Sequence, residues 1–202
     1  MSVRRIGLYG GSFDPPHLAH LALARLARDT LMLDELRWQP AGQPWQKPGR
    51  RLASGEHRVA MLRLLTQGEA GFVIDTCELD RHGPSYTVDT LREVAAVQPK
   101  AELFLVIGAD QFARLDTWKE AGEITRLSTL AVAAREGQAV MPPAAWAGSS
   151  PVWRELPLPR IDISATEVRR RAAAGEPVSP LVGEAVAGYI DQQQLYRAAP
   201  GH

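Results

Sequence analysis

Cysteine is almost absent from this sequence, since Cys77 is the single one among 202 residues. One cysteine excludes an intrachain disulfide and a metal site built from several cysteine ligands. No apolar run approaches the roughly 18 residues that a membrane-spanning helix needs. The basic pair Arg4-Arg5 is not followed by the apolar stretch of a secretory signal. These absences predict a cytoplasmic protein that has no membrane partner.

Charge of either sign is in no excess, because 23 lysine and arginine residues balance 23 aspartate and glutamate residues. This balance does not favour a nucleic-acid polymer or an anionic lipid surface as a partner. The apolar share of 45% and the charged share of 23% are ordinary for a globular protein. The length suits one substantial domain, so we expect a single domain over residues 1–202. Nothing in the sequence indicates its oligomeric state.

Strand-like and helix-like segments alternate along the first two thirds of the chain. The predicted strands cover residues 4–9, 35–40, 72–79, 102–108 and 128–135. Strands joined by helical crossovers form a parallel sheet with helices on both faces, so we expect an α/β, Rossmann-like fold. The segment 102–108 is the most apolar and should lie in the middle of the sheet. Ligands of such sheets bind at the carboxyl ends of the strands.

The last third of the chain departs from this alternation. Residues 138–159 contain five prolines and predict a surface excursion with a short strand near 152–156. Helices are expected again within about 164–196, the last of them running through 178–196. We therefore expect a small C-terminal helical appendage on the sheet domain.

The segment GGSFDPPHLAH, residues 10–20, follows the first predicted strand and leads into a helix. Gly10 and Gly11 have no Cβ, so a phosphate can approach their backbone closely. The helix should begin within one residue of His17, which places His17 and His20 on one face of its first turn. Two imidazoles at a helix N-terminus can donate to phosphate oxygens whose charge grows during phosphoryl transfer. The alternative is an ordinary glycine turn followed by structural histidines.

Two candidates lie near the end of the most apolar strand. Gly108 would let a nucleoside lie on the backbone, and Asp110 could accept from a ribose hydroxyl or an adenine amine; the alternative for Asp110 is a helix N-cap. Thr117 and Glu120 fit a capping box, which would place Trp118 in a first helical turn. There its ring could stack on a heteroaromatic base, whereas the alternative is a core tryptophan.

A second group of candidates involves another helix start and a loop. SYTVDT, residues 85–90, offers hydroxyls and free N–H groups that can bind a small carboxylate or a phosphate, although plain capping is the commoner use. Lys47 is the only lysine in the proline-rich segment 43–50. It could reach a phosphate, or it could be an ordinary surface lysine.

The segment ISATEVRRR, residues 163–171, predicts a further helix start that is capped by Ser164. Thr166 and Arg169 would lie on one face, so a triphosphate could bind there with Arg169 reaching it bidentately. The alternative is a capped helix whose arginines face solvent.

Together, GGSFDPPHLAH, SYTVDT, IGADQFARLDTWK and ISATEVR, in this order, resemble the bacterial nicotinate-mononucleotide adenylyltransferases of the HxGH nucleotidyltransferase superfamily. The resemblance extends from about Arg5 to Tyr196. Ala19 stands where the family usually has glycine, and its methyl would crowd a base or ribose lying on that backbone. Ala165 stands where the family usually has serine, which removes one hydroxyl from the phosphate end.

The resemblance implies that ATP and nicotinate mononucleotide give nicotinate adenine dinucleotide and pyrophosphate, with Mg²⁺ carried by ATP and no dedicated metal site. It implies that His17, His20 and Arg169 are catalytic. The ATP-binding residues it implies are Gly10, Gly11, Ser12, Phe13, Gly108, Asp110, Ser164 and Thr166. The acceptor-binding residues it implies are Lys47, Tyr86, Thr87, Trp118, Lys119 and Arg135.

Two other functions stay open at this point. One is an adenylyltransferase of the same fold that prefers nicotinamide mononucleotide or phosphopantetheine. The other is a nucleotide-binding regulatory module that has lost catalysis, which the replacements at Ala19 and Ala165 would favour.

Overall fold

The structure, a computed structural model, describes residues 3–42, 52–135, 139–146 and 151–197. Within these ranges, six strands form one sheet in the order β3-β2-β1-β4-β5-β6, and every neighbouring pair is parallel. The strands are β1 (Arg5–Gly11), β2 (Glu35–Pro40), β3 (Phe72–Ile74), β4 (Glu102–Gly108), β5 (Thr129–Arg135) and β6 (Trp153–Leu158). The strand order reverses between β1 and β4, as in a doubly wound sheet. The expected Rossmann-like α/β fold is therefore confirmed.

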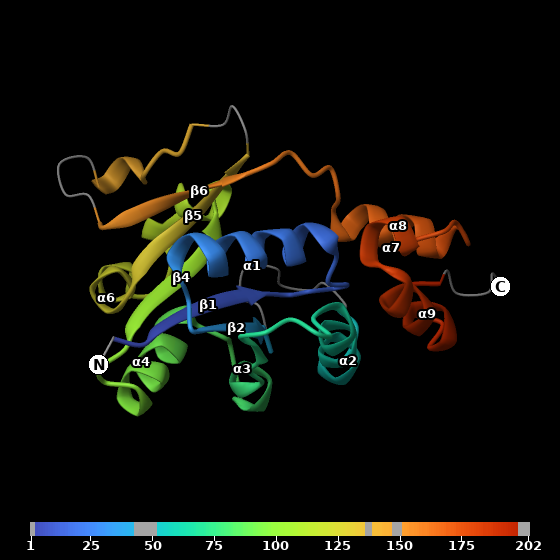
Figure 1. The fold of residues 1–202 in the computed structure, drawn as a ribbon, viewed down its shortest axis with the longest axis horizontal. Coiled ribbons are helices and arrows are strands. Elements are labelled where there is room, and N and C mark those ends of the chain that lie inside the picture. Colours follow the sequence, from blue (N-terminus) through green and yellow to red (C-terminus); the bar gives the residue numbers. More distant parts are fainter. Residues whose placement is uncertain (1–2, 43–51, 136–138, 147–150, 198–202) are drawn as a thin grey trace.

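Helices cover both faces of this sheet, as Figure 1 shows. One face packs against α1 (Leu18–Leu31), α2 (Gly55–Leu65), α7 (Ala165–Ala173), α8 (Ser179–Val182) and α9 (Glu184–Gln192). The other face packs against α4 (Thr87–Val97), α5 (Ala109–Phe112) and α6 (Ala121–Leu127). The remaining short elements are α3 (Cys77–Asp80) and the 3₁₀ turns η1 (Leu115–Thr117) and η2 (Ala144–Trp146). Among the helices of the described residues, none combines the length and apolarity needed to cross a bilayer.

Strand β4 lies in the middle of the sheet, as its apolar sequence predicts. Its side chains alternate between the two faces because successive residues of a strand point to opposite sides. Leu103, Leu105 and Ile107 enter the cluster beneath α4, whereas Phe104 and Val106 enter the cluster beneath α1. Both faces of β4 are thus buried, which fixes its carboxyl end beside that of β1.

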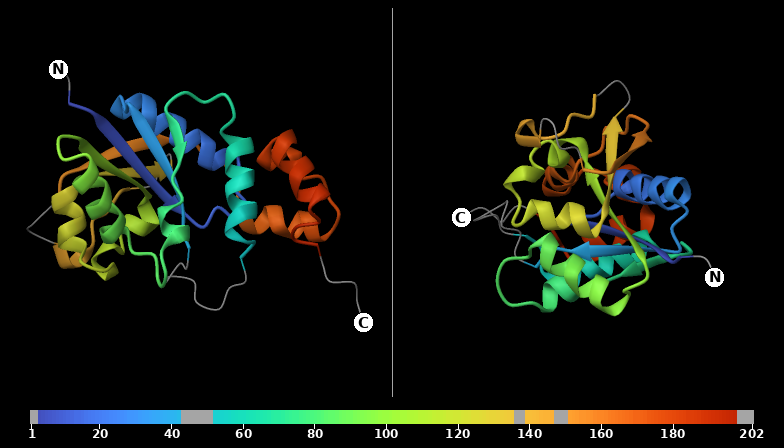
Figure 2. Two further views of the ribbon diagram at one scale, coloured as in Figure 1. Left: turned by 90° about the horizontal axis from the view of Figure 1, so that it is seen from below. Right: turned by 90° about the vertical axis from the view of Figure 1, so that its left-hand side faces the viewer.

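The C-terminal helices share their core with the sheet. Val182, Val186 and Ile190 are buried in the same cluster as Trp38 of β2 and Met61 of α2. Burying an aliphatic side chain of this kind contributes roughly 1.5–3 kcal/mol. Figure 2 shows these helices beside α2, at one end of the sheet. The assignment of residues 1–202 to one domain stays a prediction.

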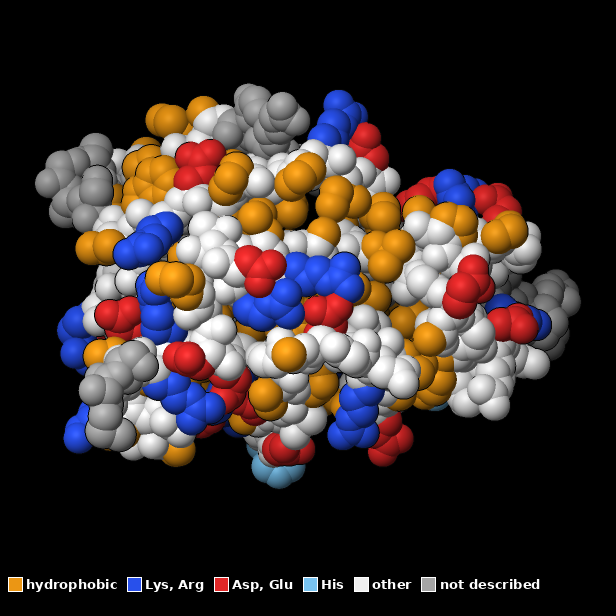
Figure 3. Space-filling view, in the orientation of Figure 1, with side chains coloured by type: hydrophobic (Ala, Val, Ile, Leu, Met, Phe, Trp, Pro, Cys, Tyr) orange, Lys and Arg blue, Asp and Glu red, His pale blue; other side chains and the backbone are white. Residues whose placement is uncertain are grey.

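Charged side chains of both signs lie interspersed on the face seen in Figure 3. Oppositely charged side chains form ion pairs between elements: the Arg25 guanidinium of α1, for example, pairs with the carboxylate of Glu69, which follows α2. This pattern accords with the balanced composition of the sequence.

Two sequence predictions need correction. The strand expected over 72–79 ends at Ile74, and residues 77–80 form helix α3 instead. The Asp75 carboxylate accepts a hydrogen bond from the backbone N–H of Cys77 (3.1 Å), so a local side-chain contact turns the chain away from the sheet. The helix expected over 178–196 is broken into α8 and α9 by Gly183, which adopts φ 82° and ψ 159°.

The segment around Trp118 also differs from the expected capping box. Thr117 ends η1, Trp118 is extended, and α6 begins only at Ala121 after Glu120 in a left-handed conformation. Helix α1 has His17 as its N-cap and begins at Leu18, within one residue of His17 as expected. The short strand expected near 152–156 is confirmed as β6.

Gly183 offers a test of this broken helix. Its backbone conformation is open almost only to glycine, so Gly183→Ala should lower the free energy of unfolding by about 1–3 kcal/mol. Gly188 is the matched control, because it lies within α9 and an added Cβ would meet nothing within 4 Å. Gly188→Ala should raise stability by up to about 1 kcal/mol. Urea unfolding of both variants checks this, and equal stabilities would contradict the assigned break.

Candidate active site

A cleft of about 280 Å³ opens at the carboxyl ends of β1, β2 and β4, where the strand order reverses. Its lining residues are Tyr9, Gly10, Gly11, Ser12, Gln39, Ala41, Glu78, Ser85, Thr87, Leu105, Val106, Ile107, Gly108, Gln111 and Trp118. Open α/β sheets bind their ligands at this kind of crevice. The cleft therefore lies where the sequence predicts a site.

The three glycines that line the cleft differ in how much space a Cβ atom would have at each position. A Cβ at Gly10 or Gly108 would meet nothing within 4 Å, so both leave their backbone open to a ligand. A Cβ at Gly11 would come within 2.9 Å of the Phe13 ring. Phe13 is itself buried, with φ 45°, and packs against Tyr9 and Trp38. The packing of an aromatic ring thus accounts for glycine at position 11.

His17 and His20 lie together at the N-terminus of α1. The backbone N–H of His17 donates to Nδ1 of His20 (3.1 Å), and the two rings stack with their centroids 3.6 Å apart. Because Nδ1 of a neutral His20 accepts this bond, its proton is assigned to Nε2. The His20 ring also contacts the Phe13 ring, and the centroids of these two rings lie 5.2 Å apart. Both histidines lie just after the cleft-lining Ser12, although neither lines the cleft itself.

His17 is uncharged at neutral pH. The residue is 6% exposed, and burial lowers its pKa to about 4. Its Nδ1 atom is buried and has no hydrogen-bond partner among the described residues. Two stacked imidazoles would repel each other if both were protonated, and a neutral His17 avoids this cost.

The loop before α1 is fixed by residues from distant parts of the chain. Asp14 is buried, and its Oδ1 atom accepts from the hydroxyl of Tyr196 (2.8 Å) and from the backbone N–H of Ala53 (3.1 Å). Arg169 donates to the backbone carbonyl of Asp14 (2.6 Å), and the buried Arg58 donates to that of Ser12 (3.0 Å). The C-terminal helices are thereby joined to the loop that carries the histidines.

Helix α7 brings the predicted phosphate-binding residues to this loop. Ser164 caps the helix by accepting from the backbone N–H of Glu167 (3.2 Å). Arg169 also donates to the Thr166 hydroxyl (3.2 Å) while it contacts Asp14. The glycine end of β1, the start of α1 and the start of α7 therefore meet at one place.

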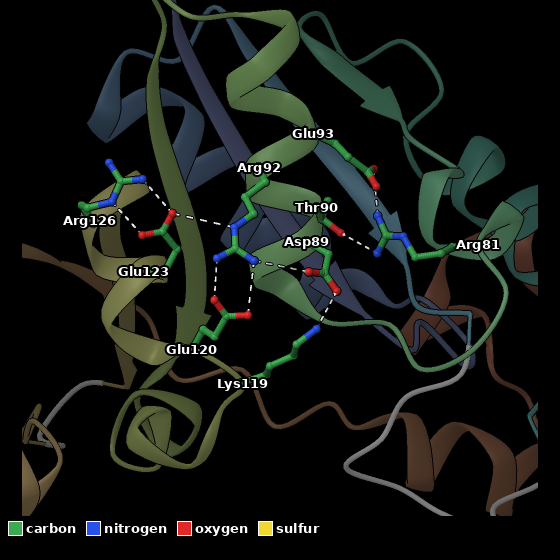
Figure 4. Close-up of polar contacts among 9 residues, drawn as sticks. All are labelled: Arg81, Asp89, Thr90, Arg92, Glu93, Lys119, Glu120, Glu123 and Arg126. Carbon is green, nitrogen blue, oxygen red and sulfur yellow. Dashed lines mark hydrogen bonds and ion pairs between the residues drawn. The ribbon is translucent and has the colours of Figure 1, made fainter.

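The predicted acceptor side is formed by α4 and the segment after η1. Tyr86 precedes α4, Thr87 is its first residue, and both Thr87 and the half-buried Trp118 line the cleft. Lys119 points toward α4, as Figure 4 shows, where its Nζ lies 3.2 Å from an Asp89 oxygen and 4.5 Å from the centre of the Tyr86 ring. It does not line the cleft.

Three predicted residues remain, and only for Asp110 does the structure describe the side chain. Asp110 is exposed in the first turn of α5 and does not line the cleft. Arg135 is the last residue of β5, and Lys47 lies outside the described residues. Their proposed roles stay predictions.

Sequence reasoning missed Gln39 and Glu78 among the polar residues of the cleft, whereas Ser85 belongs to the predicted segment 85–90. Gln39 is buried at the end of β2, and its Nε2 has no partner among the described residues; the same is true of Nε1 of Trp118. Burial raises the pKa of the Glu78 carboxyl, which accepts a hydrogen bond from Thr90 (3.0 Å). Ser85 accepts from a backbone N–H of the loop after β2. Gln39 could have been found from the sequence, because a glutamine near the carboxyl end of an otherwise buried strand is unusual. Glu78 could not, because residues 72–79 were expected to form a strand.

Among the described residues, no three histidine, cysteine, aspartate or glutamate side chains lie together so that they could hold a metal ion.

The comparison with protein families places the chain in a class. Residues 8–171 match the cytidylyltransferase-like family, and this range covers the sheet, the cleft and most of α7. A similar solved structure is the nicotinic acid mononucleotide adenylyltransferase of Plasmodium falciparum complexed with NaAD. Its TM-score is 0.77 at 18% identity, over 96% of this chain and 97% of that one. At this identity the likeness shows the fold. The chain belongs to the cytidylyltransferase-like family.

Curated relatives narrow this class. A protein of Methylibium petroleiphilum is 48% identical over 98% of this chain and 95% of its own length. A protein of Chromobacterium violaceum is 43% identical over 96% of this chain and 99% of its own length. Both are named probable nicotinate-nucleotide adenylyltransferase. Within its family the chain groups with these nicotinate-nucleotide adenylyltransferases.

The buried His17 predicts a pH dependence of stability. Its pKa is lower in the folded state (about 4) than in the unfolded state (about 6.5), so the unfolded chain binds more protons between these values. The free energy of unfolding should therefore rise with pH across this window, by about 3 kcal/mol at most. Urea unfolding from pH 4 to 7 measures it, with His17→Gln as the comparison. Equal slopes in the two proteins would contradict a buried, neutral His17.

Proposed function

We propose that this chain transfers the adenylyl group of ATP to nicotinate mononucleotide, giving nicotinate adenine dinucleotide and pyrophosphate. The observation that carries the proposal is the meeting of three phosphate-binding elements at one loop: the open backbone of Gly10, the His17–His20 pair and Arg169 with Thr166. The names of the relatives that are 48% and 43% identical over nearly the whole chain support the same reaction.

The chemistry needs little from the protein beyond alignment and charge stabilisation. An oxygen of the acceptor phosphate attacks the α-phosphorus of ATP, and a new P–O bond forms. The bond from the α-phosphorus to its bridging oxygen breaks, and pyrophosphate leaves with the electron pair. The attacking group is already an anion at neutral pH, so no general base is required. The task of the site is to align the two nucleotides and to offset developing negative charge.

The histidines are suited to that second task. A neutral His20 carries its proton on Nε2, because Nδ1 accepts the His17 N–H. A neutral His17 likewise retains one ring N–H. We assign both rings as donors to phosphate oxygens of the reacting group, together with the free N–H groups of the first turn of α1. Arg169, held beside Thr166, is assigned to the departing pyrophosphate.

The acceptor would occupy the cleft between α4 and Trp118. The first N–H groups of α4, near Thr87, can bind the nicotinate carboxylate, and the half-buried Trp118 ring can stack on the pyridine. We propose that Mg²⁺ enters with ATP, since Mg²⁺ is commonly bound through substrate phosphates and few protein ligands. The expected cytoplasmic location stays a prediction.

A substrate panel tests the proposed reaction. The protein is incubated with ATP, Mg²⁺ and either nicotinate mononucleotide or its amide, and pyrophosphate and dinucleotide are both measured. We expect dinucleotide with the acid and a lower kcat/KM with the amide, because the helix N-terminus favours an anion. Preference for the amide would contradict the assigned acceptor. ATP binding without pyrophosphate release would indicate a regulatory module.

The role of His17 has its own test. His17→Ala should lower kcat by about a hundredfold or more, the scale of a lost donor to a transition-state oxyanion. His57→Ala is the control, since His57 lies on α2 and bonds Tyr189 (2.9 Å) away from the cleft. Near-normal kcat in His17→Ala would remove His17 from the catalytic group.

A further inference from the structure

A group of ion pairs joins helix α4 to the segment that carries Trp118 (Figure 4). The Arg92 guanidinium of α4 contacts both carboxylate oxygens of Glu120, one of them at 3.2 Å. The same guanidinium lies 3.7 Å from Asp89 and 3.8 Å from Glu123. Lys119 completes the group by pairing with Asp89 at 3.2 Å. We call these contacts of Arg92 and Asp89 with Glu120 and Lys119 the α4 clamp.

The α4 clamp acts on the backbone next to the cleft. Trp118 lines the cleft, while the next two residues, Lys119 and Glu120, both reach α4. Glu120 adopts φ 51° and ψ 49°, a left-handed conformation that is uncommon for a non-glycine residue. It is held there from two sides: its backbone carbonyl accepts from the N–H groups of Glu123 (2.9 Å) and Ile124 (3.2 Å) at the start of α6, and its carboxylate meets Arg92.

The α4 clamp joins two segments that both contribute to the cleft. Thr87, at the start of α4, and Trp118 both line it. Asp89 and Arg92 lie within the next two turns of α4. The spacing between the helix N-terminus and the tryptophan ring is therefore set through Arg92 and Asp89, although neither residue lines the cleft.

We propose that Arg92 and Asp89 are positioning residues for the acceptor: they fix the distance between Trp118 and the N-terminus of α4. This inference rests on the proposed function, because it concerns the acceptor that the cleft takes. Arg92 is 43% exposed and Glu120 44%, and ion pairs this exposed to solvent contribute little to global stability. The effect of the α4 clamp is therefore on acceptor binding, with little on the stability of the fold.

The test is a steady-state comparison of the wild type with clamp variants. Arg92→Ala should raise KM for nicotinate mononucleotide roughly fivefold to tenfold, the range of coupling between contacting residues, with KM for ATP and kcat within about twofold. The conservative variant Arg92→Lys, which keeps the positive charge beside Asp89 and Glu120 but cannot make the two-oxygen contact, should recover part of the lost affinity. Arg126→Ala is the matched control, because Arg126 pairs with Glu123 on the same surface but contacts neither Glu120 nor Lys119.

Hydrogen exchange gives a readout that does not depend on activity. Amides of residues 116–123 should exchange faster in Arg92→Ala than in Arg126→Ala, with equal unfolding midpoints. An inactive wild type with this exchange difference would refute the proposed function and leave the α4 clamp standing. An active wild type with unchanged acceptor KM in Arg92→Ala would overturn the positioning role, as would unchanged exchange.

Discussion

The rest of the site depends on the hydrogen bonds of one buried residue, Asp14. Its carboxylate accepts hydrogen bonds from the Tyr196 hydroxyl and from the backbone N–H of Ala53, and its backbone carbonyl accepts one from Arg169. These partners come from the end of the chain, from the residues before α2 and from α7. Removing one partner of a buried charged group typically costs 3–5 kcal/mol, so the loop before α1 has little freedom. The start of α1, and with it the stacked His17–His20 pair, is held in place for chemistry that depends on alignment.

Different kinds of interaction hold the two ends of the site in place. The proposed phosphate end relies on part-buried hydrogen bonds at Asp14 and Ser12, made by the buried Asp14 carboxylate and the buried Arg58 guanidinium. The acceptor end relies on the exposed contacts of Arg92 with the segment after Trp118. Both sets of contacts hold the residues that we propose for the two substrates in place before those substrates bind.

Much of this architecture could be predicted from local sequence. The alternation of strands and helices predicts the parallel sheet, the apolar run of β4 predicts its central place, and Ser164 predicts the start of α7. The local sequence pattern gave wrong element boundaries where a single side-chain contact or a single backbone conformation determines the end of a strand or helix. Asp75 turns the chain after β3, and Gly183 breaks the last helix. Contacts such as that of Tyr196 with Asp14 join residues far apart in the chain, and no local pattern encodes them.

We propose that the loop before α1 brings the His17–His20 pair and Arg169 to the phosphates of ATP. A crystal structure of this protein with a non-hydrolysable ATP analogue tests this placement. We expect phosphate oxygens within hydrogen-bond distance of a ring nitrogen of His17 or His20, and the β- and γ-phosphates against Arg169. A nucleotide whose phosphates lie away from the N-terminus of α1 would contradict it.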